Sequence, residues 1–415
     1  MVFEKISVIG LGYIGLPTAA VIASRGIEVI GVDVSKKVVD TINQGKVHIV
    51  EPDLDMLVQA TVNIGRLRAT LEAEPAQAFI IAVPTPFKDG HEPDLSYIHS
   101  AAKAIAPVLE KGNLVILEST SPVGTTEKLA AWLQALRPEL SFPQSAAENA
   151  DIQVAHCPER VLPGHVLREL VSNDRIVGGM TQKCSEAAIE LYKTFVRGEC
   201  FTTNSRTAEM AKLTENSFRD VNIAFANELS IICDKLKINV WELIKLANRH
   251  PRVSILSPGP GVGGHCIAVD PWFIVDSAPE EAILIRHARE INDAKPSYVV
   301  NQVRNAAEQF KKPIIACLGL AFKADIDDLR ESPAVEITLK LAKGSLGKIL
   351  AVEPNISSLP PKLQEAGIEL VSLNRALEEA NVIVALVDHK HFKTLTRADI
   401  NAKVVVDTRG LFINF

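Results

Sequence analysis

The chain has 415 residues, more than one hydrophobic core usually holds, so two or three domains are expected. Its composition, 47% hydrophobic and 23% charged with a net charge of -6, is that of an ordinary globular protein and gives no support for a nucleic-acid partner. No apolar run is long enough to span a bilayer, and the N-terminus lacks the pattern of a signal peptide. Six cysteines without metal-ligand spacing indicate reduced thiols, a cytoplasmic location and no metal site.

The first two hundred residues alternate short apolar runs with helical patterns. Strand-like runs lie at 5–12, 28–35, 78–86, 113–122 and 152–159, each ending at or beside Gly, Pro, Ser or Thr. Because one parallel strand reaches the next through a crossover helix, this rhythm predicts a parallel sheet covered by helices. We therefore predict a dinucleotide-binding domain of Rossmann type over residues 1–200.

The middle of the chain has a helical pattern. Residues 207–236 contain neither Gly nor Pro and carry apolar residues at helical spacing, which predicts one long helix. Further helices are expected to about Ala247 and again over 282–309, with a glycine-rich loop at 259–272 between them. We predict a central helical domain over 201–310 that includes the long connecting helix and this loop.

From residue 311 the strand-and-helix rhythm restarts, with strand-like runs at 348–355, 381–389 and 402–410. It predicts a second, smaller doubly wound domain over 311–415. The predicted fold class is therefore α/β, with two doubly wound Rossmann-like domains joined by a long central helix and a helical middle domain. Ligands of open parallel sheets bind outside the carboxyl ends of the strands, so we expect the substrate between the two sheets.

A glycine pattern typical of dinucleotide sites follows the first predicted strand. In "VIGLGYIG", Gly10 allows a tight turn, Gly12 lets the backbone approach a pyrophosphate, and Gly15 permits close packing of helix on strand. Asp33 ends the next strand, where a carboxylate can bind ribose hydroxyls, and the absence of an adjacent arginine favours NAD over NADP. The predicted NAD contacts are Gly10, Gly12, Tyr13, Ile14, Gly15 and Asp33.

Three threonines near the ends of later strands are further candidates for contact with the cofactor. Thr85 lies in "VPTP", and Thr120 and Thr126 lie in "ESTSPVGTT". Because parallel strands end at the same edge of a sheet, these side chains are expected to line the same crevice as the glycines. A threonine at such a position can also be only a helix cap.

The stretch "GPGVGGHCIAVDPW", residues 259–272, places Cys266 after four glycines. A buried structural cysteine does not need such glycines, whereas a nucleophilic cysteine needs exposure at a crowded reaction centre. Beside a nicotinamide, a thiolate can capture an aldehyde and allow its oxidation to a thioester, which water hydrolyses to an acid. The sequence predicts Cys266 as that nucleophile, with a structural cysteine in a glycine-rich turn as the alternative.

The long helix supplies candidate partners for this chemistry. Lys212, Asn216 and Arg219 are spaced i, i+4 and i+7, so they share one helix face. Lys212 could stabilise a developing alkoxide or move its proton, Asn216 could donate to the same oxygen, and Arg219 could bind a phosphate or carboxylate. A solvated helix face is the alternative interpretation of the same triplet.

Seven stretches, in the same order along the whole chain, resemble the motifs of the UDP-glucose/GDP-mannose dehydrogenase family. They are "GLGYIGLP", "VPTP", "ESTSPVGTT", "CPERVLPG", "KLTENSFRDVNIAFANE", "GPGVGGHCIAVDPW" and "GLAFKADIDDLRESP". The resemblance implies an NAD-dependent four-electron oxidation of a sugar C6 hydroxyl to a carboxylate, with two NAD used per turnover.

Within the family, "NRHPRVSIL", "GPGVGGHCI" and "VDPWF" look most like members that oxidise UDP-N-acetyl-D-mannosamine for enterobacterial common antigen. Val269 stands where members that act on UDP-glucose carry lysine, which favours an N-acetylhexosamine nucleotide. The sequence does not distinguish the mannosamine epimer from UDP-N-acetylglucosamine, and UDP-glucose stays an open alternative.

The resemblance also implies roles for individual residues. It makes Cys266 the nucleophile, gives proton transfer and oxyanion stabilisation to Lys212 with Asn216, lets Asp270 assist the water or the lysine, and places Glu159 near the reacting carbon. Arginine in "HPRVS" can come from a neighbouring subunit in this family, so a homodimer is expected. The implied contacts to the UDP-sugar are Arg160, Val161, Lys212, Asn216, Arg219, His250, Arg252, Gly263, Phe322, Lys323 and Arg409, with Arg330 on the NAD side.

Two other classes of function stay open. A two-electron dehydrogenase of the β-hydroxyacid type would share the first domain and the long helix, but it needs neither the Cys266 loop nor a second Rossmann-like domain. A non-catalytic NAD-binding regulator would make the co-occurrence of Lys212, Asn216 and Cys266 accidental. Both therefore explain less of the sequence than the UDP-sugar dehydrogenase does.

Overall fold

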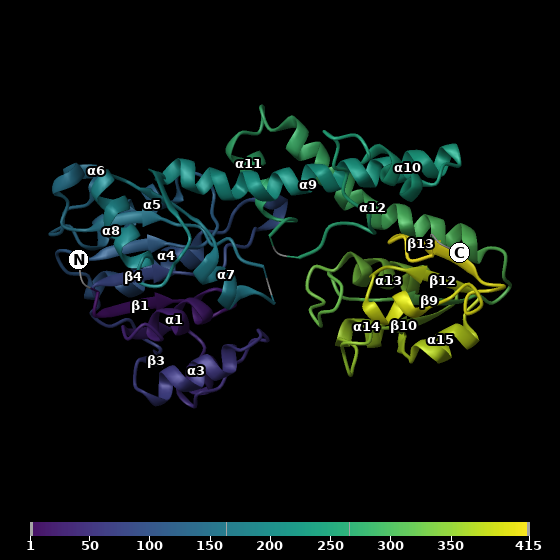
Figure 1. Ribbon diagram of the computed structural model, residues 1–415, viewed down its shortest axis with the longest axis horizontal. Helices are drawn as coiled ribbons and strands as arrows, with labels where there is room; N and C mark the ends of the chain where they lie inside the picture. Colours follow the sequence, from purple (N-terminus) through teal and green to yellow (C-terminus); the bar gives the residue numbers. More distant parts are fainter. Residues whose placement is uncertain (1–2, 163, 265, 413–415) are drawn as a thin grey trace. The chain divides into compact units, whose positions relative to one another are not determined.

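The computed structural model describes residues 3–162, 164–264 and 266–412, and Figure 1 shows it coloured along the chain. The chain divides into two compact units, residues 1–215 and 216–415. The division falls within one helix, α9 (Ser205–Leu236), which begins in the first unit and continues in the second. Among the described helices, none has both the length and the apolar character needed to cross a membrane.

The first unit is built on an eight-stranded sheet with the order β3-β2-β1-β4-β5-β6-β7-β8. The order reverses between β1 and β4, and this is the point where doubly wound sheets bind ligands. The strands are β1 (Lys5–Ile9), β2 (Glu28–Val32), β3 (Leu67–Thr70), β4 (Ala78–Ile81), β5 (Leu114–Leu117), β6 (Gln153–His156), β7 (Arg175–Gly179) and β8 (Cys200–Asn204).

The predicted parallel sheet is confirmed, and one pair of neighbouring strands departs from the parallel arrangement. β6 and β7 run antiparallel, whereas all other neighbours in this sheet are parallel. A parallel return needs a connection that crosses over the sheet. The residues between β6 and β7 instead build the short helix α7 (Val166–Ser172), which packs against α1 (Gly15–Ala23).

Helices cover both faces of the first sheet, so its central strands are apolar at consecutive positions instead of alternating. β4 and β5, with the sequences AFII and LVIL, are buried at every position. α1 is likewise buried along its whole length. The remaining helices and short 3-10 turns are α2 (Lys36–Asn43), α3 (Leu54–Asn63), η1 (Asp89–His91), α4 (Ser96–Ile105), η2 (Ala106–Val108), α5 (Thr125–Leu136), α6 (Pro143–Ala146), η3 (Ala147–Asn149) and α8 (Gln182–Tyr192).

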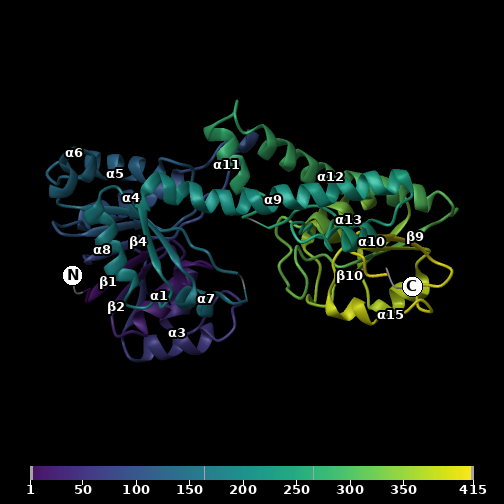
Figure 2. The same ribbon diagram turned by 45° about the horizontal axis from the view of Figure 1, so that its top comes forward.

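The long helix predicted over 207–236 is confirmed by α9, which both ribbon views show as one continuous helix (Figures 1 and 2). It is followed by α10 (Val240–Ala247), whose first turn is capped by Asn239 through bonds from the amides of Trp241 and Glu242. Two further helices complete the predicted helical region, α11 (Asp270–Ser277) and α12 (Ile283–Ala307).

The second sheet confirms the second Rossmann-like fold. Its five strands are all parallel and have the order β11-β10-β9-β12-β13, which reverses between β9 and β12. α12 packs against α13 (Pro333–Lys343) and against β12 and β13, which ties the helical region to this sheet. The other elements are β9 (Ile314–Leu318), β10 (Lys348–Val352), α14 (Pro361–Glu365), β11 (Glu369–Leu370), α15 (Leu373–Glu379), β12 (Val382–Ala385), η4 (Lys390–Thr394) and β13 (Val404–Asp407).

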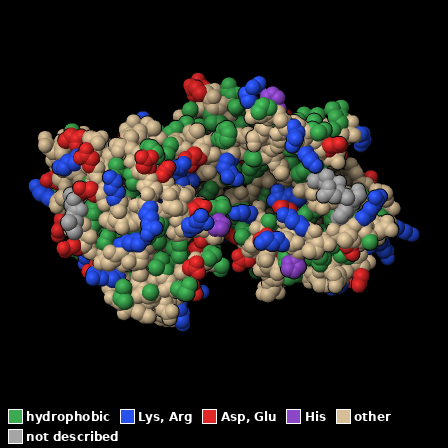
Figure 3. All heavy atoms as spheres, in the orientation of Figure 1, with side chains coloured by type: hydrophobic (Ala, Val, Ile, Leu, Met, Phe, Trp, Pro, Cys, Tyr) green, Lys and Arg blue, Asp and Glu red, His purple; other side chains and the backbone are tan. Residues whose placement is uncertain are grey.

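Charged side chains of both signs are interspersed on the face of the molecule shown in Figure 3. This agrees with the small net charge of -6. The visible surface carries no broad field of one sign that would steer a highly charged polymer.

Candidate active site

The glycine turn after β1 has the geometry that a dinucleotide site requires. Gly10 has φ +91° and donates its amide to Val32 O at 2.8 Å. A Cβ on Gly15 would lie 1.8 Å from Gly10 O, so no side chain fits where α1 packs on the turn. A Cβ on Gly12 would meet no atom within 4 Å, so open space adjoins the backbone where a pyrophosphate would approach.

Asp33 is fixed beside that turn, at the end of β2. Its Oδ2 accepts from the Leu11 amide at 3.0 Å, and its Oδ1 accepts from the Ser35 amide at 2.9 Å. The carboxylate is therefore held beside the glycine turn, where such a group can bind ribose hydroxyls, and α1 begins at the same turn, where a helix N-terminus can bind phosphates. Tyr13 and Ile14 are half-buried between the glycines. These residues fit NAD, and the roles of the individual residues stay predictions.

The three predicted threonines lie in different surroundings. Thr85 Oγ1 donates to Thr120 O at 2.5 Å, so the ends of the two segments are joined. Thr126 is fully buried, and both its amide and its hydroxyl donate to Glu209 Oε1, at 2.7 and 2.6 Å. Glu209 Oε2 accepts from the Gly124 amide at 2.6 Å, so this carboxylate fastens the start of α5 to α9. The structure thus shows an anchoring contact for Thr126, and its contact with a cofactor stays a prediction.

The second unit repeats the turn geometry of the first. Gly319 follows β9 with φ +91° and donates its amide to Val352 O at 2.8 Å, as Gly10 does to Val32. Glu353 stands where Asp33 stands in the first unit, and its Oε2 accepts from the amides of Leu320 and Ala321 at 2.7 and 3.0 Å. The second sheet therefore presents its own nucleotide-type turn at the point where its strand order reverses.

Glu159 and Lys212 interact within the first unit. Glu159 is buried, its Oε2 accepts from the Val161 amide at 2.6 Å, and its Oε1 has no hydrogen-bond partner among the described residues. Burial raises the pKa of Glu159, and the charges of Arg175 and Lys212 oppose that rise. Lys212 is half-buried on α9. A buried carboxyl with a raised pKa beside a lysine is a typical proton-transfer arrangement.

Glu118 is a second buried carboxyl group, and it interacts electrostatically with Glu159. Glu118 accepts from the Tyr192 hydroxyl at 3.2 Å and lies 3.9 Å from the Arg175 guanidinium. Burial raises the pKa of Glu118 to about 7, while Arg175 opposes the rise and Glu159 adds to it. Arg175, the first residue of β7, therefore opposes the rise in pKa of two buried carboxyl groups, those of Glu118 and Glu159.

The other predicted residue of "CPER" forms an ion pair with the long helix. Arg160 Nη2 lies 2.7 Å from Glu215 Oε1, and its Nη1 donates to Asp174 O at 3.3 Å. Val161 is half-buried, and its amide is the donor to Glu159. The segment 159–161 is therefore held against α9 by side-chain contacts.

Cys266 lies in a loop whose glycines touch neighbouring segments of the second unit. The Cys266 side chain is exposed, and its carbonyl accepts from the amides of Val269 and Asp270 at 3.0 and 2.9 Å, which joins it to the start of α11. A Cβ on Gly263 would lie 2.6 Å from Glu331 O, and one on Gly264 would lie 3.2 Å from the Phe322 ring. Neither position has room for a side chain, and the role of this loop around a substrate stays a prediction.

Asn216 connects the long helix to the cysteine loop. Its Nδ2 donates to Asp270 Oδ2, and both side chains are buried. Asp270 lies four residues beyond Cys266, and Asn216 lies one helical turn beyond Lys212. Two of the predicted catalytic residues are thus in direct contact.

Two of the predicted ligand contacts in the C-terminal region, Phe322 and Arg409, lie near the same loop. Phe322 packs beside Gly264, and a Cβ on Gly259 would lie 2.8 Å from Arg409 Nη1. Arg409 also forms an ion pair with Asp388 at 3.3 Å. Lys323 and Arg330 are exposed, and Arg330 pairs with Asp328 at 2.6 Å. The assignment of Arg330 to NAD would join the two units and stays a prediction.

The remaining three predicted residues are exposed. Arg219 lies on α9, and His250 and Arg252 lie in a loop after α10. In that loop the His250 Nδ1 accepts from the Arg252 amide at 3.3 Å. No described contact brings these side chains to the cysteine loop.

Sequence reasoning missed four buried ionisable side chains that contact the turns and strands around predicted residues: Glu209, Glu118, Arg175 and Glu353. Glu209 lies on the predicted helix three residues before Lys212, and this position close to a predicted catalytic residue could have pointed to it. Arg175 and Glu118 adjoin buried strands, where an ionisable residue calls for a partner. The partners themselves lie far along the chain and could not be assigned from spacing.

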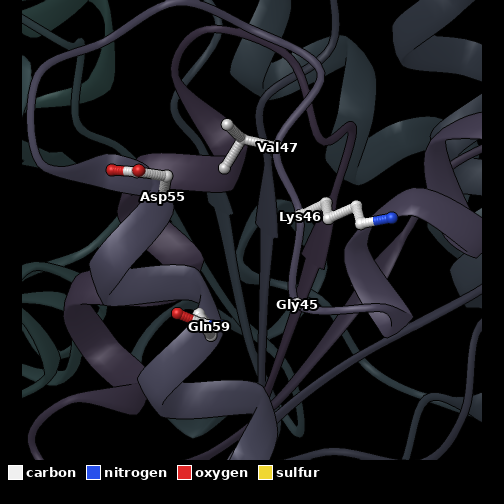
Figure 4. Close-up of a pocket in the computed structure, with 5 residues that line it drawn as sticks. All are labelled: Gly45, Lys46, Val47, Asp55 and Gln59. Carbon is white, nitrogen blue, oxygen red and sulfur yellow. The ribbon is translucent and has the colours of Figure 1, made fainter.

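A shallow hollow elsewhere in the first unit contains none of the predicted site residues. It is lined by residues after α2 and on α3, and Lys46 extends away from Asp55 (Figure 4). Over the described ranges, no group of three or more His, Cys, Asp or Glu side chains could hold a metal ion.

Two Rossmann-type sheets, each with a nucleotide-type turn, and a loop cysteine joined to a lysine-bearing helix define a nucleotide-dependent dehydrogenase. Three models of the UDP-glucose/GDP-mannose dehydrogenase family match the chain: the NAD binding domain at 4–196, the central domain at 206–294 and the UDP binding domain at 316–414. The chain belongs to this family and is an NAD-dependent UDP-sugar dehydrogenase.

Relatives with different named substrates match almost the whole chain. A protein of Ralstonia nicotianae named NDP-N-acetyl-D-galactosaminuronic acid dehydrogenase is 67% identical over 99% of this chain and 96% of its own. A UDP-N-acetyl-D-mannosamine dehydrogenase of Campylobacter jejuni is 68% identical over 94% of this chain and 96% of its own. The solved UDP-D-ManNAc dehydrogenase of Pyrococcus horikoshii is 41% identical with a TM-score of 0.88, covering 98% of this chain and 96% of its own.

Proposed function

We propose that this chain oxidises the C6 hydroxyl of UDP-N-acetyl-D-mannosamine to a carboxylate in two successive two-electron steps. The observation that carries the proposal is the Asn216–Asp270 bond, which attaches the Cys266 loop to the helix one turn from Lys212. We assign NAD binding to residues 1–200, the reacting groups to 201–310 together with Glu159, and UDP-sugar binding to 311–415.

In the first oxidation, Lys212 takes the proton of the C6 hydroxyl as its oxygen becomes a carbonyl, and Asn216 donates a hydrogen bond to that oxygen. NAD, when bound, accepts the hydride that C6 loses in each of the two oxidations. The product of this first step is the C6 aldehyde. Asn216 keeps its orientation because its amide is bound to Asp270.

In the second oxidation the Cys266 thiolate adds to the aldehyde carbon, which makes a thiohemiacetal that loses a second hydride to become a thioester. Water then attacks the thioester carbon, the C–S bond breaks, and the acid and the thiol are released. Glu159 and Asp270 are assigned to this water: both are buried, and the raised pKa of Glu159 suits it to accept and return a proton.

Two N-acetylhexosamines have specific support as the substrate. Relatives named for UDP-N-acetyl-D-mannosamine include the Campylobacter jejuni protein at 68% identity, and the absence of lysine at Val269 agrees with an N-acetylated sugar. The 67% identical Ralstonia nicotianae protein supports an N-acetylgalactosamine nucleotide as the second candidate. UDP-N-acetylglucosamine and UDP-glucose rank below both. The enzyme would act in the cytoplasm. The UDP-linked uronic acid that it produces would be a precursor of a surface polysaccharide such as enterobacterial common antigen.

A homodimer is proposed from the surface of α9. Phe218, Phe225 and Ile232 recur at seven-residue intervals and are 69%, 50% and 46% exposed. Side chains at this spacing share one helix face, and an exposed apolar face on a globular protein is typical of a protein contact. The exposed Arg252 and His250 would then be available to the neighbouring subunit's sugar nucleotide.

Initial rates with a panel of UDP-sugars test the substrate. We expect kcat/KM for UDP-N-acetyl-D-mannosamine to exceed that for UDP-N-acetylglucosamine, UDP-N-acetylgalactosamine and UDP-glucose by about 10-fold or more, the discrimination that a few pocket contacts supply. NADH absorbance measures the rate, and NADP in place of NAD is the cofactor control. Equal or higher kcat/KM for UDP-N-acetylgalactosamine would replace the proposed substrate by the second candidate.

A further inference from the structure

A line of four buried polar side chains runs between α9 and α12 and ends at the cysteine loop. We infer that Asn227 and Asn292 are positioning residues, which fix the first glycine of this loop through a hydrogen-bond chain of defined direction. The effect on turnover rests on the proposed function, whereas the effect on the loop does not. The four side chains are Asp220, Asn227, Arg289 and Asn292, each at most 1% exposed.

The hydrogen-bond chain begins at the ion pair between Arg289 and Asp220. Arg289 Nη1 donates to Asp220 Oδ1 at 2.5 Å, and Asn292 Nδ2 donates to the same oxygen at 2.8 Å and to Asp220 O at 3.1 Å. Asn227 Nδ2 donates to Asn292 Oδ1 at 2.8 Å. Asn227 Oδ1 accepts from the Gly259 amide at 2.9 Å. Every link is within hydrogen-bond distance.

The direction of the hydrogen-bond chain follows from its first acceptor, the carboxylate of Asp220. Asp220 presents only oxygens to Asn292, so Asn292 has to turn its Nδ2 toward Asp220 and its Oδ1 toward Asn227. Asn227 then has to turn its own Nδ2 toward Asn292. The Asn227 Oδ1 then faces the Gly259 amide and accepts a hydrogen bond from it. The orientation of each amide is thus dictated by the one before it.

The position of Gly259 controls the path of the residues that lead to Cys266. Gly259 is buried, and Cys266 lies seven residues later. The intervening Gly261 has φ +149°, and a Cβ there would lie 3.1 Å from both Pro296 Cγ and Pro333 Cβ. A loop so closely surrounded has few alternative paths, so the anchor at its start constrains where the thiol is presented.

Two variants test the inference, with amide hydrogen exchange and steady-state kinetics as readouts. Asn227→Leu removes the acceptor for Gly259, and we expect exchange of the backbone amides of Gly259 and of residues 261–264 to speed up by about 10-fold or more. We expect kcat to fall by about 10-fold or more while KM for NAD changes less than 2-fold, because the predicted NAD contacts other than Arg330 lie in the other unit. Asn292→Ala leaves Asn227 in place but unoriented, so the same changes are expected at smaller size.

Asn381→Leu is the matched control, because Asn381 Oδ1 also accepts from a backbone amide of this unit, that of Ile314 at 2.9 Å. It should lower Tm without changing exchange at 259–264 or kcat. Unchanged exchange in both test variants, or an equal fall of kcat in the control, overturns the inference. Faster exchange with unchanged kcat would confirm the anchor on Gly259 but overturn its role in positioning the Cys266 loop for turnover. If Asn227→Leu does not fold, Asn292→Ala decides the result.

Discussion

Replacing Cys266 by serine is expected to abolish formation of the uronic acid while sparing much of the first oxidation. A serine hydroxyl adds poorly to the aldehyde at neutral pH, and the acyl intermediate that it forms is a poorer substrate for water than a thioester. Loss of the nucleophile in enzymes with acyl intermediates lowers kcat by factors on the order of 10³ to 10⁶, and we expect a fall in this range for the second oxidation.

Rapid-quench analysis of the sugar products measures the two oxidations separately in the Cys266→Ser enzyme. The matched control is Cys200→Ser, because Cys200 is the other thiol with solvent exposure, and this variant should keep the parent rate. Acid formation at the parent rate in Cys266→Ser would reduce Cys266 to a structural residue. An equal loss in Cys200→Ser would mean that serine substitution harms the fold.

Replacing Lys212 by methionine is expected to lower kcat by about 10² to 10⁴-fold, the usual contribution of a positioned proton-transfer group. Methionine matches the unbranched lysine side chain as far as Cε and has a similar helix propensity, so the fold of α9 should persist. Lys212 also opposes the raised pKa of Glu159, so the variant should raise that pKa further and move the acid limb of the kcat–pH profile to higher pH.

Steady-state rates across pH measure both effects of the Lys212→Met change. Lys235→Met is the control, since Lys235 is an exposed lysine on the same helix and should be neutral to substitution. KM for NAD should change little in either variant. A parent-like kcat in Lys212→Met would remove the lysine from the chemistry, and an unshifted acid limb would remove its coupling to Glu159.

The fold was predictable because its signals are local. The glycine spacing after β1, the apolar runs of the buried parallel strands and the uninterrupted pattern of α9 each lie within a few dozen residues. The antiparallel β6–β7 pair was not predictable, because the direction of a strand depends on where its connection packs. Nothing in the sequence of β7 itself differs from that of a parallel strand.

The candidate site was only partly predictable for the same reason. Cys266, Lys212 and Asn216 carry local signals, the glycine-rich loop and the helix face. The groups that hold them do not. Glu209 reaches Gly124 across 85 positions, and Asn227 reaches Asn292 across 65. Such contacts depend on how α9 packs against α5 and α12, which no spacing rule supplies.

Gly10 and Gly319 form turns of the same geometry, one in each unit. Each turn ends a central strand beside a carboxylate, Asp33 in one unit and Glu353 in the other, and each carboxylate accepts backbone amides of its turn. The family models assign NAD to the first of these sheets and UDP to the second.

The most direct test of the account counts the NADH released for each molecule of UDP-N-acetyl-D-mannosamine consumed at completion. Capture of the aldehyde by the Cys266 sulfur predicts two NADH per sugar, with the uronic acid as the sole sugar product. A single NADH per sugar, with the aldehyde accumulating, would contradict it.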